Sequence, residues 1–254
     1  MPANLSHAGG PMIYAVSPWL PGNPSKGKRH QLLSDNERAQ LAKISSIVRF
    51  KKGEQIYNEG DASDAAFNII SGVVAAYREL PESGEHITSF LHAGDIFGLS
   101  EGGCYTNTCR AITPVVAYKT PVAAMRRVLA SSADLDVNVI IKLCEELRQA
   151  QRHAFLLTEK RAVSRLAMFL DLHEHLQNAE GEAASEIYLP MDRSDIAAYL
   201  GLTLPAISRA FRTLTSEKII SCRDRRHVRI LDRRAFERIA DHQSHQRMTG
   251  EVAG

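Results

Sequence analysis

Residues 192–212 read DRSDIAAYLGLTLPAISRAFR, and they have the pattern of two short helices joined at Gly201. Apolar residues recur at helical spacing on both sides of this glycine, which permits the left-handed turn of a tight helix junction. Asp192 is placed to cap the first helix and Thr203 to cap the second, in which Pro205 falls within the first turn. The pattern predicts a helix-turn-helix, whose second helix enters the major groove of DNA.

The exposed side of the predicted second helix has the chemistry of a DNA reader. Arg209 is the candidate for reading a base, because arginine forms bidentate bonds with guanine O6 and N7. Other expected DNA contacts are the helix residues Leu204, Pro205 and Ser208 and the phosphate ligands Thr203, Arg193, Arg212, Arg225 and Arg226. Solvation alone is the alternative explanation for any single exposed arginine.

The charge distribution supports a nucleic-acid partner. The chain has a net charge of only +2, but residues 193–238 contain 11 Lys and Arg against 5 Asp and Glu. Phosphate backbones attract such a basic segment, although a solvated helical face would also produce it.

A strand-like segment follows the helix pair. Residues 219–230 alternate between apolar and polar positions on both sides of an Arg-Asp-Arg-Arg tip at 223–226, which is typical of a β-hairpin and predicts a wing. Cys222 lies in this hairpin, where its oxidation would add negative charge close to DNA phosphates. An inert, half-buried strand cysteine is the alternative.

The N-terminal half has a different sequence pattern, in which short β-like runs are separated by glycine turns. From Val48 to about Met125, runs at residues 55–57, 67–70, 73–77 and 87–91 alternate with turns near Gly53, Gly60, Gly72, Gly84 and Gly94. Many short strands with regular turns predict a rolled sheet. Ahead of them, Ser34 and Glu37 form a capping pattern that predicts a helix over residues 34–46.

One long helical repeat connects the two halves. Within residues 133–158, apolar side chains recur at alternating steps of three and four, namely Ile140, Leu143, Leu147, Ala150, Ala154 and Leu157. This heptad seam fits a helix packed on its own domain and a dimerisation helix equally well. A further amphipathic helix is expected over residues 160–178, where His173 and His175 are interpreted as a solvated polar face.

The composition, with 44% hydrophobic and 24% charged residues in 254, is that of an ordinary globular protein. We find no apolar run of membrane-spanning length and no secretory signal. The four cysteines are sparse enough to suit a reducing cytoplasm. No P-loop, HExxH motif or Ser/His/Asp arrangement points to an enzyme.

The order of these segments resembles the CRP/FNR family of bacterial transcription regulators over about residues 30–240. The β-like half carries FKKGEQIYNEGD at 50–61, ISG at 70–72 and AGDIFG at 93–98, and the helix pair carries DIAAYLGLT at 195–203 and ISR at 207–209. The resemblance implies a homodimeric activator that binds a palindromic DNA site and recruits RNA polymerase. It therefore favours a dimer interface along the seam.

These observations predict an α+β chain in five parts. The parts are a flexible arm (1–28), a cyclic-nucleotide-binding-like β-roll (29–132), a dimerisation helix (133–158), a winged helix-turn-helix domain (159–241) and a tail (242–254).

Departures from the family pattern bear on the cofactor. Cyclic-nucleotide sensors of the family hold the phosphate with a Gly-Glu pair and an Arg-Ser or Arg-Thr pair, whereas here Gly98 precedes Leu-Ser-Glu and the second position reads Tyr105-Thr. Without the phosphate-pairing arginine we expect no cAMP response. Arg110, further along the chain, is assigned a structural role.

The cysteine pattern also differs from that of the oxygen sensors of the FNR type. No cysteine precedes Cys104, and Tyr118 occupies the position of their internal cysteine, so an iron–sulfur cluster is not expected. Haem is not expected either, although His86, His92 and Cys104 lie in the right domain. The pattern most resembles the FixK-like branch, which lacks the cysteine cluster and is often controlled by its own abundance.

The reader helix departs from its relatives at one position. FNR and FixK proteins usually have glutamate where this chain has Pro205, while Ser208 and Arg209 remain. Glutamate accepts a hydrogen bond from cytosine N4 and proline cannot, so we expect a half-site that keeps the guanine but is altered at the neighbouring pair. The alternative function is a ligand- or redox-sensing signalling module that requires an unidentified effector.

Overall fold

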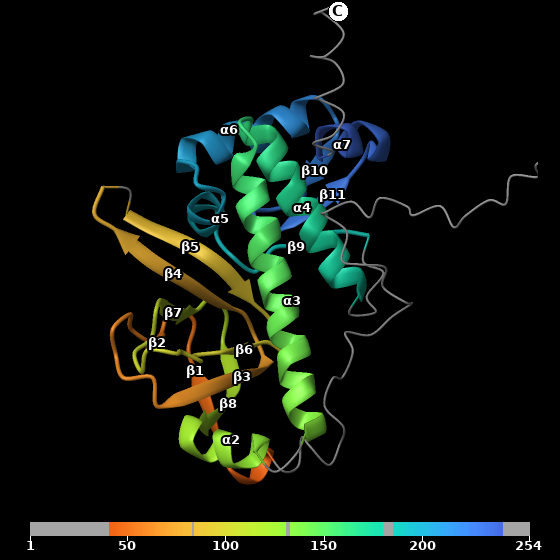
Figure 1. Ribbon diagram of the computed structural model, residues 1–254. Helices are drawn as coiled ribbons and strands as arrows, with labels where there is room; N and C mark the ends of the chain where they lie inside the picture. Colours follow the sequence, from red (N-terminus) through yellow and green to blue (C-terminus); the bar gives the residue numbers. More distant parts are fainter. Residues whose placement is uncertain (1–40, 83, 131–132, 180–184, 241–254) are drawn as a thin grey trace, which may run out of the picture.

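Figure 1 shows the computed structural model, which describes residues 41–82, 84–130, 133–179 and 185–240. A β-roll and a winged helical unit lie at opposite ends of the molecule, and one long helix runs beside both. The predicted arm (1–28), the start of the helix expected over residues 34–46 and the tail (242–254) lie outside the described residues.

The β-roll consists of two four-stranded antiparallel sheets, with strand orders β1-β8-β3-β6 and β2-β7-β4-β5. The strands are β1 Ser46–Phe50, β2 Gln55–Tyr57, β3 Ala65–Ser71, β4 Val74–Leu80, β5 Gly84–Leu91, β6 Ile96–Phe97, β7 Thr108–Ala111 and β8 Val115–Pro121. The rolled sheet predicted from the glycine-separated runs is confirmed.

Gly72 shows why glycine is required at one of these turns. Its φ is +96°, and a Cβ atom at this position would lie 2.3 Å from the carbonyl oxygen of Pro114. Both the backbone conformation and the close approach of another chain segment exclude a side chain.

The predicted β region extends too far at its C-terminal end. Helix α2 (Val122–Leu129) begins directly after Pro121, so the prediction of strand up to Met125 was wrong. Two alanines at 123 and 124 favour helix, and Met125 packs against Ala66 of the roll. At the other end, β1 begins at Ser46, where helix was expected.

Helix α3 (Ala133–Thr158) has the predicted bounds, and α4 (Ala162–Ala179) follows it. A single hydrophobic cluster joins the two domains, since it contains Phe90 of β5, Leu156 of α3 and Phe169 of α4. The same cluster continues into the winged unit, while a second cluster that contains Phe67 and Phe97 fills the interior of the roll.

The winged unit contains the predicted helix pair, α5 (Arg193–Leu200) and α6 (Leu204–Ser216), and the predicted hairpin, β10 (Ile220–Cys222) and β11 (His227–Ile230). Two of its elements were not predicted from the sequence: β9 (Ile187–Tyr188), which adds to β11, and α7 (Arg233–Ala240), which buries Phe236. In the described part of the chain, no helix is long and apolar enough to cross a bilayer.

Candidate nucleic-acid interface

The junction of α5 and α6 has the geometry predicted for a helix-turn-helix. The Asp195 carboxylate accepts a hydrogen bond from the Asp192 backbone N–H at 2.9 Å in the first turn of α5. Gly201 ends α5 in the left-handed conformation, with φ 60° and ψ 39°. The Thr203 hydroxyl then caps α6 by accepting from the Ala206 N–H at 3.3 Å. These bonds satisfy backbone amides at the start of each helix.

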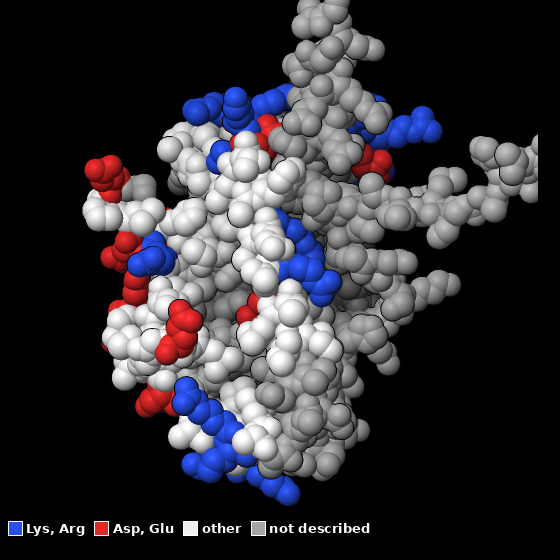
Figure 2. Space-filling model, viewed as in Figure 1, with Lys and Arg blue, Asp and Glu red and all other residues white. Residues whose placement is uncertain are grey.

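Helix α6 separates its residues into a buried and an exposed face. The buried side chains are Ile207, Ala210, Phe211 and Leu214. The predicted DNA contacts on this element are all exposed, namely Thr203 at the cap and Leu204, Pro205, Ser208, Arg209 and Arg212 on the helix. Figure 2 shows Lys and Arg side chains gathered at the end of the molecule that carries α6 and α7. Neither Arg209 nor Arg212 has an ion pair within the described ranges, so both guanidinium groups are available to a ligand.

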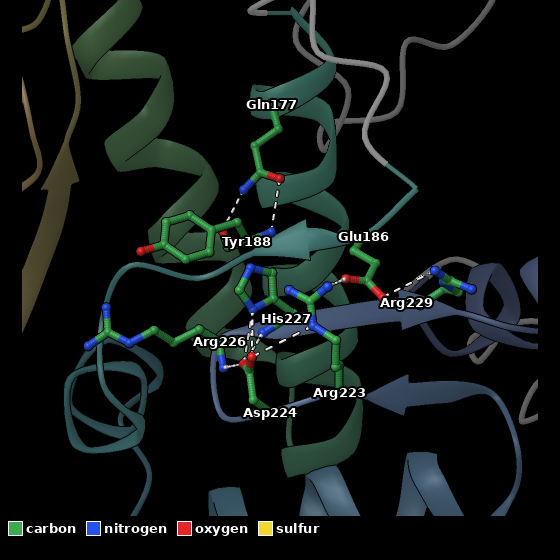
Figure 3. A network of polar contacts seen from close by, with 8 residues as sticks. All are labelled: Gln177, Glu186, Tyr188, Arg223, Asp224, Arg226, His227 and Arg229. Atoms are coloured by element: carbon green, nitrogen blue, oxygen red, sulfur yellow. Dashed lines mark hydrogen bonds and ion pairs between the residues drawn. The ribbon is translucent and has the colours of Figure 1, made fainter.

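The wing is held in shape by a carboxylate at its tip (Figure 3). Asp224 accepts hydrogen bonds from the backbone N–H groups of Arg226, at 2.7 Å, and His227, at 2.9 Å. It also faces the His227 Nδ1 atom at 2.9 Å. The Arg226 backbone bond and the His227 contacts lower the pKa of Asp224 to about 2, so this exposed carboxylate stays ionised and keeps the tip folded.

Two wing arginines are paired with the same acidic residue. Glu186 lies just before β9, and its carboxylate lies 3.1 Å from Arg223 and 3.2 Å from Arg229. Beside it, the Gln177 side chain of α4 accepts from the Tyr188 N–H at 3.0 Å, which positions β9 (Figure 3). Glu186, which lies outside residues 193–238, therefore offsets part of the positive charge counted in that segment.

Arg226 and Arg225 differ, although both were predicted to contact phosphate. The Arg226 guanidinium donates to the Pro190 carbonyl at 2.9 Å and to the Asp192 carboxylate at 3.0 Å, which ties the wing to the start of α5. This geometry gives Arg226 a structural role within the winged unit, and its phosphate contact stays a prediction. Arg225 is exposed at the tip and has no ion pair with any described residue, so it fits the prediction.

Arg193 also makes a contact within the protein that the sequence did not predict. Its guanidinium carbon lies 3.1 Å from the centroid of the Phe211 ring, and the group is half-buried between α5 and α6. Burial lowers the pKa of Arg193, as expected for a cation withdrawn from water. The structure therefore favours a packing role for Arg193 over the phosphate contact.

The cysteines lie in contrasting surroundings. Cys222 is half-buried in β10, and its redox role stays a prediction. Cys109 is fully buried, and burial raises the pKa of its thiol to about 12, which makes it a poor nucleophile. Cys104 and Cys144 are exposed.

Aromatic side chains fill the interior of the β-roll. The rings of Tyr57 and Tyr105 stack with centroids 3.7 Å apart, and Phe67 and Phe97 stack at 5.2 Å. The Tyr105 hydroxyl, in the segment where cyclic-nucleotide sensors have their arginine, donates to the Ala65 carbonyl at 2.9 Å. Within the described residues, no group of three or more His, Cys, Asp or Glu side chains is placed to hold a metal ion.

The seam of α3 faces solvent. Ile140 is 53% exposed and Leu147 59% exposed, and Leu143, Ala150 and Ala154 are exposed as well. Leu157 differs, because it is half-buried and packs against the core shared with the winged unit. Most of the predicted dimer seam is therefore an uncovered apolar stripe in the single chain.

Two residues that couple α3 and α4 to the helix pair were missed from the sequence. The Arg165 guanidinium of α4 donates to the carbonyls of Leu157, at 3.0 Å, and Leu200, at 2.7 Å. The His153 ring of α3 stacks on Tyr199 at 3.9 Å, and its Nε2 atom lies 2.7 Å from the Tyr199 carbonyl oxygen. Neither contact can be recognised from the sequence, because each joins a side chain to a backbone group that is distant in the chain.

His173 is not part of a solvated face, and that interpretation was wrong. It is 3% exposed and packs on Phe169, Phe90 and His92 between α4 and β5. Burial lowers its pKa to about 3, so the ring is neutral at physiological pH. His175 is half-buried and contacts the Asp171 carbonyl oxygen at 2.7 Å.

The roll, the connecting helix and the winged helix pair together define a DNA-binding transcription regulator. Residues 47–132 match the cyclic nucleotide-binding domain family, and residues 164–239 match the Crp-like helix-turn-helix domain family. The nitrogen fixation regulation protein FixK of Bradyrhizobium diazoefficiens is 33% identical over 179 residues, which cover 70% of this chain and 75% of FixK. The chain belongs to the CRP/FNR family, in its FixK-like branch.

Further relatives agree with this assignment. The transcriptional activatory protein AadR of Rhodopseudomonas palustris is 28% identical over 209 residues, 82% of this chain and 87% of AadR. The solved structure of FixK2 from Bradyrhizobium japonicum superposes with a TM-score of 0.71 at 27% identity, over 78% of this chain and 98% of FixK2.

Proposed function

We propose that this regulator is a homodimer that binds a palindromic, FNR/FixK-like promoter site and activates transcription through contact with RNA polymerase. The exposed apolar seam of α3 carries the proposal. A stripe containing Ile140, Leu143 and Leu147 is unfavourable in water, and a second copy of the same helix would cover it in a self-complementary interface. As a DNA-binding regulator similar to bacterial proteins, it would act in the cytoplasm.

The two reader helices of such a dimer would enter successive major grooves about one helical turn apart. Arg209 would read guanine, with Ser208, Leu204 and Pro205 beside it, and Thr203, Arg212 and Arg225 would contact phosphates. Since Pro205 offers no acceptor for cytosine N4, the base pair next to that guanine would differ from the FNR type.

We infer that the protein needs no cAMP, iron–sulfur cluster or haem, and that its abundance sets its activity. The stacked rings of Tyr57 and Tyr105 support this inference, since they and their aromatic neighbours fill the interior of the roll. So does the Ser100 hydroxyl, which donates to the Cys104 carbonyl at 2.6 Å in the loop where the family's sensors bind phosphate.

The test is selection from a randomised palindromic DNA library by purified protein without ligand or metal, followed by sequencing. Enrichment of a symmetric site with half-sites one turn apart is the expected result. Enrichment of no site would contradict ligand-independent binding and favour the alternative, in which an effector is required. Recovery of an unaltered FNR-type half-site, with equal preference beside the guanine, would contradict the role given to Pro205.

A further inference from the structure

The helix pair is attached to the β-roll through one face of α5. Phe90 of β5 and Tyr199 of α5 pack with ring centroids 5.2 Å apart, and Tyr77 and Ile87 of the roll belong to the same buried cluster. The exposed face of α6 is left uncovered in this arrangement. The attachment of the two domains is therefore compatible with DNA binding.

A half-buried ion pair crosses this attachment. Arg110 of β7 donates to the Asp195 carboxylate of α5 at 2.9 Å, and the side chains are 20% and 12% exposed. The same Arg110 group pairs with Glu85 of β5, and it lies over the Tyr77 ring at 5.3 Å. Arg110 therefore contacts the roll through Glu85 and Tyr77 and contacts α5 through Asp195.

The Arg110–Asp195 pair adds direction to a contact that is mostly apolar, beside a longer and exposed ion pair between Lys52 of the roll and Asp192 at 3.4 Å. Apolar packing is non-directional and permits small rotations of α5 on the sheet, whereas a charge-assisted hydrogen bond fixes distance and angle. The other Asp195 oxygen accepts from the Asp192 N–H, and Asp192 in turn binds the wing through Arg226. Arg110 thus acts on the start of α5, where the helix pair and the wing meet.

We propose that Arg110 is a positioning residue for DNA recognition, which through Asp195 holds α6 at the orientation that lets a dimer engage both half-sites without a ligand. The proposal rests on the proposed palindromic dimer. A dimer binds two half-sites at once only if its two α6 helices have the right separation and orientation. A small rotation of α5 in each protomer produces a larger displacement of one α6 helix relative to the other. Binding of one half-site does not depend on that geometry.

The test replaces Arg110 with methionine, which keeps an apolar stem over Tyr77 and leaves the Asp195 cap of α5 in place. The matched control is Arg78→Met in β4, because Arg78 pairs with Glu59 inside the roll and with no carboxylate in the described part of the winged unit. Affinities are measured for the selected palindrome and for a duplex with one half-site.

Arg110→Met is expected to weaken palindrome binding about tenfold and to leave half-site binding unchanged, while Arg78→Met changes neither. Arg110→Lys, which restores the positive charge, is expected to recover part of the affinity. Wild-type palindrome affinity in Arg110→Met, or an equal reduction on the half-site, would overturn the proposal.

A second measurement separates this proposal from the proposed function. Hydrogen exchange of the α5 amides is expected to be faster in Arg110→Met than in Arg78→Met, whether or not the wild type selects a palindrome. Equal exchange in the two variants would show that Arg110 does not hold α5. Failure of the wild type to dimerise or select DNA, with faster α5 exchange in Arg110→Met, would refute only the proposed dimer.

Discussion

The Arg193 guanidinium packs on the Phe211 ring, with its carbon 3.1 Å from the ring centroid, and so joins the start of α5 to the middle of α6. A cation over an aromatic ring is attracted by the ring's quadrupole, most strongly where water is excluded. Arg193 therefore stabilises the helix pair from within, while Arg209 and Arg212 stay on its outer face.

Arg193→Ala should lower the free energy of unfolding by about 1–2 kcal/mol, since it removes both the cation–π interaction and the packed stem. Chemical denaturation monitored by circular dichroism measures the change. Arg212→Ala is the control, and it should leave stability within about 0.5 kcal/mol while weakening DNA binding. If the Arg193→Ala protein has normal stability but its DNA binding depends less on salt, Arg193 contacts phosphate as the sequence predicted.

Arg209→Ala should cost about 1–3 kcal/mol at the selected site and remove the preference for guanine at one position of each half-site. Binding to the selected site and to a set with that guanine replaced measures both effects. If Arg209→Ala keeps the guanine preference, another residue reads that base.

Arg225→Ala should weaken binding to all sequences similarly, because a phosphate contact carries no sequence information. The slope of log affinity against log salt concentration should become shallower by about one for each phosphate that the variant no longer neutralises. Arg226→Ala serves as the contrast, since removal of its bonds to Pro190 and Asp192 should destabilise the wing itself. A sequence-selective effect of Arg225→Ala would argue for base reading at the wing.

Leu147→Glu should convert the protein to a monomer, because it places a carboxylate in the middle of the proposed apolar interface. Sedimentation velocity gives the mass, and palindrome affinity should fall about a hundredfold because a monomer cannot bind both half-sites. Arg148→Glu introduces the same residue one position along, off the seam, and should stay dimeric. A dimeric Leu147→Glu protein would place the interface elsewhere.

The elements that could be predicted well from the sequence are those specified by neighbours in the chain. Thr203, Gly201 and the spacing of Ile207, Phe211 and Leu214 define the helix pair locally, and caps and periodicity are visible without a structure. Likewise the wing follows from alternation around its charged tip.

The sequence does not reveal side-chain contacts that depend on distant partners. Arg193 and Arg226 look like any exposed arginine in the sequence, yet one packs on Phe211 and the other binds a carbonyl 36 positions away. His173 has the spacing of a polar face, but the face of α4 that carries it is covered by β5. Periodicity cannot reveal a domain contact of this kind.

His173 should make the stability of the fold dependent on pH. Its pKa falls from 6.5 to about 3 on burial, so the unfolded chain takes up a proton that the folded chain does not. Stability is therefore fully present above about pH 6.5 and decreases as the pH falls toward 3, by about 1.4 kcal/mol per pH unit. Between about pH 7.5 and about pH 5, the decrease from this residue is about 2 kcal/mol.

His173→Phe should remove that part of the pH dependence, because a neutral ring fits among Phe169 and Phe90 without a proton to exclude. Denaturant unfolding of the variant and the wild type at both pH values measures the difference. Some pH dependence should persist in His173→Phe, since burial also lowers the pKa of His153. An unchanged slope in His173→Phe would mean that His173 is protonated in the folded chain or that the interface opens before it titrates.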